Sequence, residues 1–471
     1  MMLNINKVKQ CYNRFKENQL HYLTIDKYYY GNTDELKSSF NLPNRSNARI
    51  KTNFIQKLVD EEALYSFGNK VTFKAIDERH KEALSHISYY FKNNGAGYSN
   101  SIGKKLVEFQ LGYELNFITK DNKFKSKYIT PLEGDVWLNE YDEPEFFIYV
   151  HTTLKEDEKG NYKLVDCIDV YDDKYVYYLD NSFRQIGVPK AHNMGTIPVG
   201  VGMVDGVRYT NKNGYHEGDK TIFRTIKTLQ DAIEQNCSDI TQEITDFHNA
   251  ILKFYGVDLE DLTDKDGKVI VDSQGRPLKK EPILGQNSVL YFNDKTKEDA
   301  EWLIKNINDT FIKNTRDDFK DLIYTLTSHI DNNEKMQSNL SGVALRSKLR
   351  CLEAKCKSNE NAMEDIIRKR IQCLFNWLRL TNKGDFDENM ISIEFTPCVP
   401  EDIQVIADVI SKISHEVLSN ETKRAMLANV YGNVENEQER INREKKAMLE
   451  YEVDLDKLGD EYETNTESEI I

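Results

Sequence analysis

Asp264, Asp266 and Gly267 form the first pattern in this sequence that could bind a metal ion. Calcium-binding loops place oxygen ligands at alternate positions and close with a bidentate glutamate about twelve residues along. Gly275 occupies that closing position here, and an apolar Val-Ile-Val run stands where further ligands are needed. The pattern therefore favours an Asp-Gly turn between two short strands over a calcium site.

Cysteine is the second residue type that could do chemistry. Cys351 and Cys356 stand five positions apart in one expected helix, and Cys373 follows. Zinc sites usually place paired cysteines about two to four positions apart with histidines at matching spacing, and none of the nine histidines supplies that pattern. Buried, reduced thiols are the favoured interpretation, and the odd total of seven cysteines fits a cytosolic setting.

No motif of a common enzyme class occurs in the sequence. The glycine pairs Gly95-Ala96-Gly97 and Gly200-Val201-Gly202 lack the lysine of a phosphate-binding loop and the context of a dinucleotide-binding fold. There is no G-x-S-x-G nucleophile motif, and no two acidic residues stand out as an acid–base pair. We therefore expect no catalytic activity, no cofactor and no bound metal.

The net charge of −15 argues against a protein that holds nucleic acid by bulk attraction, because phosphate binding needs a basic surface. It is compatible with DNA that passes beside the protein without sticking. The 471 residues, 39% hydrophobic and 30% charged, are typical of a folded protein of about two to four domains. No apolar run of membrane-spanning length and no signal-peptide core occur, so we expect a cytoplasmic protein without a membrane span.

Three long amphipathic helices are expected, at 219–254, 297–330 and 341–379. The first would be roughly 54 Å long, which is more than one compact neighbour can cover. It needs a hairpin partner, or copies of itself from other subunits. Its apolar residues recur at steps of three and four: Ile222, Ile226, Leu229, Ile233, Cys237, Ile240, Ile244, Phe247, Ile251 and Phe254.

The remaining segments predict an α+β protein that is mainly helical. Alternating apolar and aromatic runs separated by turn residues predict an antiparallel β region over 111–209. A small β insert is expected at 257–295, between the first two long helices, and a single strand at 391–395. Beyond that strand the chain is highly charged, and from Tyr451 it carries eight acidic residues and one lysine.

Charge is distributed unevenly among the three long helices. The segment 219–254 holds six acidic and four basic residues, and 297–330 holds seven and five. The segment 341–379 holds nine basic and four acidic residues. One interpretation is an ordinary solvated surface with ion pairs. The other is that the acidic helices line a channel while the basic helix packs on acidic neighbours, and charge alone leaves both open.

Short stretches spread over most of the chain form an ordered series: Tyr30-Gly31-Asn32, Leu42-Pro43-Asn44, Asn47-Ala48-Arg49-Ile50, Thr52-Asn53-Phe54, Leu58-Val59-Asp60, Gly195-Thr196-Ile197-Pro198-Val199, Ser238-Asp239, Asp246-Phe247, Asn249-Ala250, Ser341-Gly342-Val343-Ala344-Leu345 and Ser419-Asn420-Glu421-Thr422. In this order they resemble the portal proteins of tailed bacteriophages, in the siphophage type of Gram-positive hosts. Each stretch is weak alone, and the order carries the resemblance. The chain departs from the family pattern at Ile233-Glu234-Gln235 and over 211–218.

The resemblance implies the portal architecture, a ring of about twelve subunits around a channel for double-stranded DNA at one capsid vertex. The portal itself would hydrolyse nothing, because a separate motor supplies the energy. The implied parts are a wing (1–218), a stem helix (219–256), a clip (257–296), a returning stem helix (297–330), a tunnel loop (331–340), a long helix and strand returning to the wing (341–400) and a helical crown with an acidic tail (401–471).

The resemblance also implies partners and site residues. The clip would contact the large subunit of the terminase and later the head–tail adaptor, and the ring would contact the major capsid and scaffolding proteins. The protein would be assembled in the host cytoplasm and end in the virion. The candidates are Lys335, Met336, Gln337 and Asn339 for DNA contact in the tunnel loop, Ile226, Ile233, Ile240, Ile244, Phe247, Phe311 and Leu322 for stem packing, and Asp266, Gly267, Arg276 and Tyr291 for partner binding at the clip.

Two other classes of function stay open at this point. One is a cytoplasmic coiled-coil scaffold without a nucleic-acid role, and the other is an enzyme whose site follows no recognised motif. The insert at 257–295 favours the portal over the scaffold, because a hairpin held between two antiparallel helices suits a ring with a protruding collar.

Overall fold

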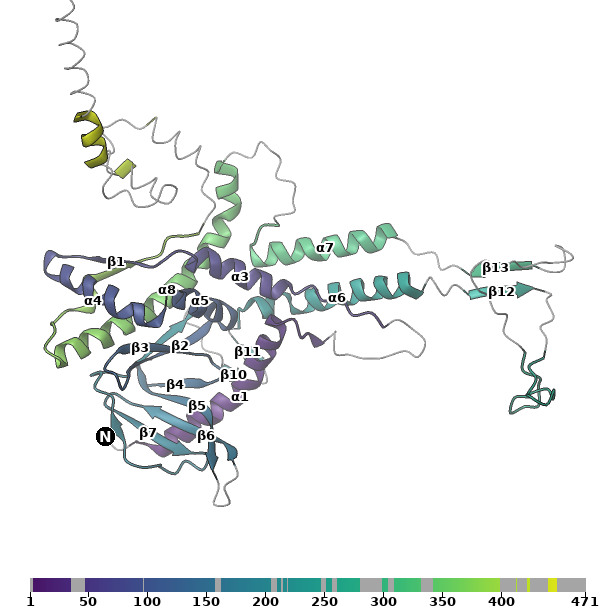
Figure 1. The fold of residues 1–471 in the computed structure, drawn as a ribbon, viewed down its shortest axis with the longest axis horizontal. Helices are drawn as coiled ribbons and strands as arrows, with labels where there is room; N and C mark the ends of the chain where they lie inside the picture. Colours follow the sequence, from purple (N-terminus) through teal and green to yellow (C-terminus); the bar gives the residue numbers. More distant parts are fainter. Residues whose placement is uncertain are drawn as a thin grey trace, which may run out of the picture. The chain divides into compact units, whose positions relative to one another are not determined.

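The computed structural model divides the chain into two compact units, which we describe separately. One unit comprises Met1–Glu334 and Leu349–Pro397, and the other comprises Lys335–Lys348 and Cys398–Ile471. The first unit holds most of the elements labelled in Figure 1. The structure describes residues 3–34, 47–95, 97–156, 162–204, 210–212, 215–217, 219–246, 251–255, 261–279, 299–303, 309–331, 342–398, 412, 422–423 and 439–446.

Helix α1 (Ile5–Tyr29) begins at Asn4, whose side chain accepts hydrogen bonds from two backbone amides of the first turn. It ends before Gly31, because Gly31 adopts a φ of 67° that continues no helix. The first half of α1 packs Val8 and Phe15 on a β-sheet, and its second half enters the main core. One helix thus joins two hydrophobic clusters.

The predicted antiparallel β region is confirmed as two sheets. The larger is a five-stranded meander whose order follows the sequence. Successive residues of β5 face opposite sides, as a strand requires: Phe146 and Ile148 face α1, whereas Phe147 packs on the smaller sheet. The strands are β4 (Gly134–Leu138), β5 (Pro144–Glu156), β6 (Tyr162–Tyr171), β7 (Tyr175–Asp180) and β8 (Lys190–Ala191).

The smaller sheet has three antiparallel strands in the order β3-β2-β9, and a separate two-stranded hairpin follows it in the chain. The edge strand β9 of the three-stranded sheet lies directly against a long helix, α8. A Cβ on Gly202 would stand 2.7 Å from the carbonyl oxygen of Ala362, so only glycine allows this approach. The bounds are β2 (Leu111–Ile118), β3 (Phe124–Ile129), β9 (Val199–Met203), β10 (Thr210–Lys212), β11 (Tyr215–Glu217) and α8 (Gly342–Leu380).

The glycine pair at 200–202 therefore serves close packing between a strand and a helix. A buried ion pair reinforces the same contact: the guanidinium of Arg370 on α8 donates to both carboxylate oxygens of Glu114 on β2, at 2.8 and 2.6 Å. The two side chains are 3% and 0% exposed. Bidentate geometry of this kind compensates for the desolvation of both charges.

The main core lies among helices α3, α4, α5, α6, α7 and α8 and the second half of α1. A two-stranded sheet joins residues far apart in sequence, because β1 pairs with β14. The elements are α3 (Phe54–Phe67), β1 (Thr72–Ala75), α4 (Lys81–Phe91), α5 (Tyr98–Phe109), β14 (Ile391–Glu394) and three 3-10 turns at Glu78–His80, Lys92–Asn94 and Glu388–Met390. The predicted strand at 391–395 and helix at 341–379 are thus confirmed.

Helices α6 (Ile222–Asp246) and α7 (Asp309–Thr327) pack side by side as a pair that we call the arm (Figure 1). Both are shorter than the sequence predicted. The helix expected over 219–254, and with it the stem helix 219–256, is wrong at its end, because Ile251–Tyr255 is strand β12. The returning helix expected over 297–330 is wrong at its start, because Asp299–Leu303 is strand β13.

The physical reason for this error is that residues 251–255 fit both a helix and a strand. Ile251 and Phe254 continue the helical stripe at a step of three, but the five residues of β12 are rich in apolar and aromatic side chains that suit a strand. Antiparallel pairing with β13, from Ile251 opposite Leu303 to Tyr255 opposite Asp299, decides between the two. A distant partner therefore overrides the local pattern.

The acidic pattern at 264–267 is a turn, as predicted. The amide of Gly267 donates to the carbonyl of Asp264 at 3.1 Å, and Gly267 has a φ of 78°. The Asp264 carboxylate accepts from the amides of Asp266 and Lys268, both at 2.9 Å. Gly275, the residue at the closing position of a supposed calcium loop, is itself a turn residue with a φ of 77°.

The cysteines of α8 allow a first test of the packing. Cys356 and Cys373 are buried, and burial raises the pKa of each thiol to about 12, whereas Cys351 is exposed. We expect a thiol reagent at pH 8 to label Cys351 within minutes and to leave the other two unreacted until the chain unfolds. Peptide mass spectrometry of the labelled protein measures this, with the Cys351→Ser variant as control. Fast labelling of Cys373 in the native protein would contradict the packing of α8.

Candidate functional site at the root of the helical arm

The first turn of α6 is fixed by a capped entry. Thr221 is the N-cap residue, and its hydroxyl oxygen accepts from the amide of Arg224 at 3.1 Å. Asp219 in turn accepts from the amide and the hydroxyl of Thr221 at 2.9 and 2.7 Å, and its other oxygen lies 2.8 Å from Nε2 of His21 on α1. The entry to the arm is therefore tied to α1.

The Asp219 carboxylate is buried, with a side chain that is 1% exposed. Burial alone would raise its pKa, but the hydrogen bonds from His21 and Thr221 outweigh burial and lower the pKa below its ordinary value. The carboxylate consequently stays ionised at neutral pH and contributes to stability there.

The apolar side of α6 enters the core at its first turns. Ile222, Ile226 and Ile233 are buried, and the ring of Phe223 forms a T-shaped pair with the ring of Tyr28 on α1, with centroids 5.1 Å apart. Full burial of an aliphatic side chain contributes about 1.5–3 kcal/mol each. The root of the arm is therefore a firmly packed part of the main core.

A row of polar side chains on α6 is buried as well: Gln230 and Glu234 are 0% exposed, and Ser238 is 5% exposed. Steps of four place the three on one side of the helix. They accept hydrogen bonds from the backbone of residues 50–55, which lead into α3. The row thus fastens α6 to the start of α3 by polar contacts.

Helix α7 ends in a Schellman motif. The amide of His329 donates to the carbonyl of Tyr324 at 3.0 Å, the amide of Ser328 donates to that of Thr325 at 3.3 Å, and Ser328 has a φ of 61°. A non-glycine residue in this left-handed conformation costs about 1 kcal/mol, so the surroundings must hold it.

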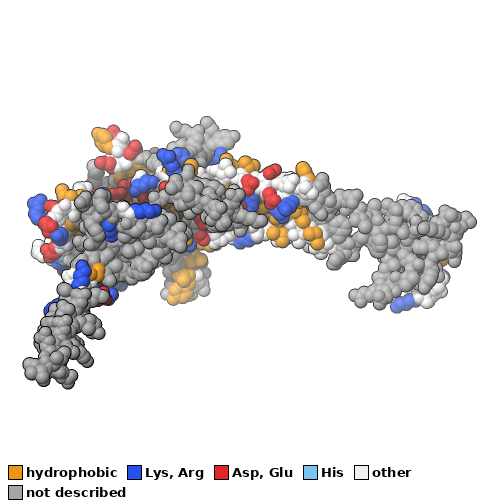
Figure 2. Space-filling view, turned by 90° about the horizontal axis from the view of Figure 1, so that it is seen from above, with side chains coloured by type: hydrophobic (Ala, Val, Ile, Leu, Met, Phe, Trp, Pro, Cys, Tyr) orange, Lys and Arg blue, Asp and Glu red, His pale blue; other side chains and the backbone are white. Residues whose placement is uncertain are grey.

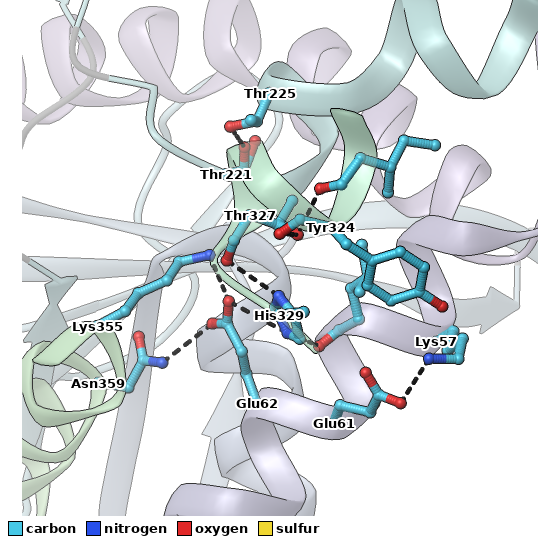
Figure 3. Close-up of polar contacts among 12 residues, drawn as sticks. Lys57, Glu61, Glu62, Thr221, Thr225, Tyr324, Thr327, His329, Lys355 and Asn359 are labelled. Atoms are coloured by element: carbon cyan, nitrogen blue, oxygen red, sulfur yellow. Dashed lines mark hydrogen bonds and ion pairs between the residues drawn. The ribbon is translucent and has the colours of Figure 1, made fainter. Parts of the chain in front are cut away.

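The side chain of His329 supplies that hold, because it is buried between α7, α3 and α8 (Figure 3). Its ring nitrogens lie 3.0 Å from the carbonyl oxygen of Thr327 and 3.2 Å from that of Leu58 on α3. Its Nε2 is 3.8 Å from the carboxylate of Glu62. Burial lowers the pKa of His329, against the opposing effect of the Glu62 charge.

Glu62 connects this histidine to α8. Its carboxylate forms an ion pair with Lys355 and accepts from the side-chain amide of Asn359 at 3.3 Å (Figure 3). The side chain of Glu62 is 2% exposed. One carboxylate of α3 therefore joins the end of α7 to the middle of α8. The start of α6 and the end of α7 are thus anchored on the same core.

The structure separates the predicted stem-packing residues into two groups. Ile226 and Ile233 are buried in the core, and Ile240 is half-buried. Ile244, Phe311 and Leu322 are 60%, 67% and 46% exposed within the single chain. The second group therefore does not belong to the core of one subunit, and Phe247 lies outside the described residues.

The other predicted site residues are not brought together with the root of the arm. Asp266, Gly267 and Arg276 lie in exposed turns of the insert at 261–279, and Tyr291 lies outside the described residues. All four tunnel-loop candidates, Lys335, Met336, Gln337 and Asn339, also lie outside them. Their roles stay predictions.

Sequence reasoning missed the polar anchors, namely Gln230, Glu234 and Ser238 on α6 and Glu62 and His329 around the end of α7. In α6 the polar row beside an apolar stripe is what any amphipathic helix shows, so the sequence does not distinguish these buried side chains from solvated ones. For Glu62 and His329 the sequence likewise holds no signal, since their partners are distant in the chain.

Two further findings concern the part of the chain that the structure describes. No group of three or more histidine, cysteine, aspartate or glutamate side chains is placed there to hold a metal ion. No helix of those residues has both the length and the apolar character that crossing a membrane requires.

Comparison with known proteins finds an extended match to a protein family. A family model described as phage portal protein, SPP1 Gp6-like, matches residues 8–450. No curated protein matches the sequence. A chain from the neck of an empty GTA particle, computed with C6 symmetry, aligns with a TM-score of 0.42 at 10% identity, over 79% of this chain and 89% of that chain. A chain from the virion of the native gene transfer agent (GTA) particle aligns with a TM-score of 0.41 at 9% identity, over 87% and 93%.

The entry to α6 yields a prediction about pH. We expect Asp219→Asn to lower the free energy of unfolding at pH 7 by about 1–3 kcal/mol, because charge-assisted hydrogen bonds in a buried site are lost. A carboxyl pKa lowered by folding stabilises the protein above about 3.9, the value in an unfolded chain, and that contribution disappears as pH falls through the folded pKa. The difference in free energy of unfolding between Asp219→Asn and the unsubstituted chain should therefore shrink in strong acid.

Denaturant unfolding between pH 7 and pH 3, followed by circular dichroism, measures this difference. Asp121→Asn, which changes an exposed aspartate in the turn after β2, is the matched control. A difference between Asp219→Asn and the unsubstituted chain that stays constant down to pH 3 would contradict the assigned hydrogen bonds.

Proposed function

Because the chain belongs to the SPP1 Gp6-like family of phage portal proteins, we propose that copies of it form a ring-shaped channel at one capsid vertex. Double-stranded viral DNA passes through this channel during packaging and ejection. The arm is the stem of the portal, the residues between its helices are the clip, and the sheets with the surrounding helices are the wing. The number of subunits, about twelve, follows from the family resemblance alone.

The observation that carries the proposal is the two-sided character of α7. Ile323 and Tyr324 are buried in the core, while Leu322 and Leu326, in the same turns, are 46% and 54% exposed. We call Leu322, Leu326 and the 67% exposed Phe311 the exposed stripe of α7, since steps of four and eleven place them on one side. In Figure 2, hydrophobic side chains reach the surface along the arm among acidic and basic ones.

A second copy of the chain is the partner that fits the exposed stripe. Exposed aliphatic side chains on a helix gain about 1.5–3 kcal/mol each when they are fully buried. Closed symmetry covers such a surface on every subunit, in a two-fold dimer as well as in a larger ring. The stripe therefore supports self-association, and the choice of a ring rests on the family resemblance.

The charge of the arm suits the passage of DNA. Asp317 and Asp321 are exposed on α7 beside the exposed stripe, and the exposed Asp318, four residues before Leu322, lies on the same side as the stripe. Acidic side chains repel phosphate groups over about 10 Å at moderate ionic strength, so DNA slides without adhering. Transient contacts then come from Lys335, Met336, Gln337 and Asn339 of the proposed tunnel loop, and this assignment rests on the family resemblance.

The remaining assignments complete the proposal. Asp266, Gly267 and Arg276 are exposed, and with Tyr291 they form the partner-binding surface of the clip for the terminase and then the head–tail adaptor. The wing and crown contact the major capsid and scaffolding proteins. The protein is assembled in the host cytoplasm, resides in the virion and catalyses no reaction. The siphophage type and the Gram-positive host stay predictions.

Electron microscopy of the purified protein tests this function. We expect negative-stain images to show rings with a central hole. The variant Leu322→Ser/Leu326→Ser should remain folded, because both side chains are exposed, and should lose the rings, because the contact between copies is weakened. Fibres would instead favour the scaffold interpretation. Monomers under all conditions would contradict the proposed ring.

Two controls separate assembly from folding. Leu20→Ser changes a leucine of α1 that is 72% exposed, and we expect it to leave the rings intact. Ile226→Asp places a charge in the core, where Ile226 is 0% exposed, and should unfold the root of the arm. Circular dichroism reports the fold of each variant, and rings formed by Leu322→Ser/Leu326→Ser would show that the exposed stripe is no interface.

A further inference from the structure

Glu234 of α6 is a buried carboxylate at which distant segments of the chain meet. It is 0% exposed, and it belongs to the short stretch where the sequence departs from the family pattern. Removing a carboxylate from water is costly unless donors replace the lost hydration. The donors that do so here belong to three different parts of the chain.

The first donor comes from the end of α1. The hydroxyl of Thr33, four residues beyond that helix, donates to one carboxylate oxygen of Glu234 at 2.5 Å. The other oxygen accepts from the amide and the hydroxyl of Thr52 at 3.1 and 3.3 Å. Thr33 and Thr52 therefore both bind the carboxylate of Glu234, one on each of its oxygens.

The third donor is Gln230, one turn earlier on α6, whose side-chain amide lies 3.4 Å from Glu234. Its carbonyl oxygen accepts from the amide of Ile55 at 3.0 Å, in the first turn of α3. This bond replaces a missing cap, because Asn53 precedes α3 with a φ of 51° and its side chain makes no capping hydrogen bond. Helix α3 is thus capped by α6.

The position of Glu234 also has an electrostatic basis. Its carboxylate accepts from the amide of Thr52, two residues before α3 begins, where the helix macrodipole favours a negative charge. Ser238, one turn later on α6, accepts from the amide of Ile50 at 2.9 Å and extends the same line of contacts. Among the residues that the structure describes, the donors to the Glu234 carboxylate are hydroxyl and amide groups.

We propose that Glu234 is a positioning residue that fastens Thr33, after the end of α1, and Thr52, before the start of α3, to α6. If α6 is a stem helix, which rests on the proposed function, Glu234 couples the stem to the wing. The coupling acts within one chain and needs no ring.

Hydrogen exchange of the purified full-length chain tests the proposal. We expect Glu234→Gln to raise the exchange rate of amides in 47–56 on the order of ten-fold, because a charge-assisted contact becomes a neutral one. Glu234→Ala should raise it further, while peptides from the buried part of α8 keep their rates. Asp239→Asn, an exposed carboxylate on the same helix, is the matched control and should change nothing in 47–56.

A double-mutant cycle makes the test specific to the contact. Thr33→Val removes the hydroxyl and keeps the shape of the side chain, so its effect on 47–56 should be smaller in the Glu234→Gln background than alone. Additive effects would overturn the proposal, and so would unchanged exchange in 47–56 or an equal rise throughout the chain. The measurement is independent of ring formation, so its failure and the failure of the proposed function are distinguishable.

Discussion

The attachment of α6 to the core is the constraint on which the arm depends. Two packed helices share a single seam, and isolated helices of this length are marginal in water without tertiary contacts. The burial pattern follows from this: Ile226 and Ile233, near the root, are buried, whereas Ile244, towards the far end, is 60% exposed. The same first turns carry the capped entry at Thr221 and the polar row, so apolar burial and directed hydrogen bonds act on one short piece of helix.

Buried polar contacts join the arm to α3, α3 to α8, and α8 to the smaller sheet. His329 holds the end of α7 on α3, Glu62 joins α3 to α8, and Arg370 of α8 binds Glu114 of β2 in bidentate geometry. Such contacts add little net stability over apolar packing of equal volume, but removing one partner leaves a buried charge without compensation, which costs about 3–5 kcal/mol. Their effect is to favour one arrangement of α3, α7, α8 and β2, because each contact is directional and joins particular groups on two elements.

Much of this fold could be predicted from periodicity, and the failures have one cause. The long helix α8, the antiparallel β region and the strand β14 carry patterns that local residues determine, so they were predicted correctly. Residues 251–255 fit both a helix and a strand, and only their pairing with 299–303 decides. The anchors Glu234 and His329 escaped for the same reason, since their partners lie elsewhere in the chain. Contacts between distant segments, rather than local propensity, determine both the ends of the arm and its attachment.

The end of α7 is the place where folding and assembly meet in the proposed ring. Leu326 is exposed, while Thr327 and His329, one and three residues later, are buried by the Schellman motif and the Glu62 network. A neighbouring subunit that covers Leu322 and Leu326 would therefore contact a turn whose backbone is already fixed from the other side. A surface held rigid before binding loses less conformational entropy when a partner covers it. The polar network inside each subunit thus favours association between subunits, although none of its side chains need touch the neighbour.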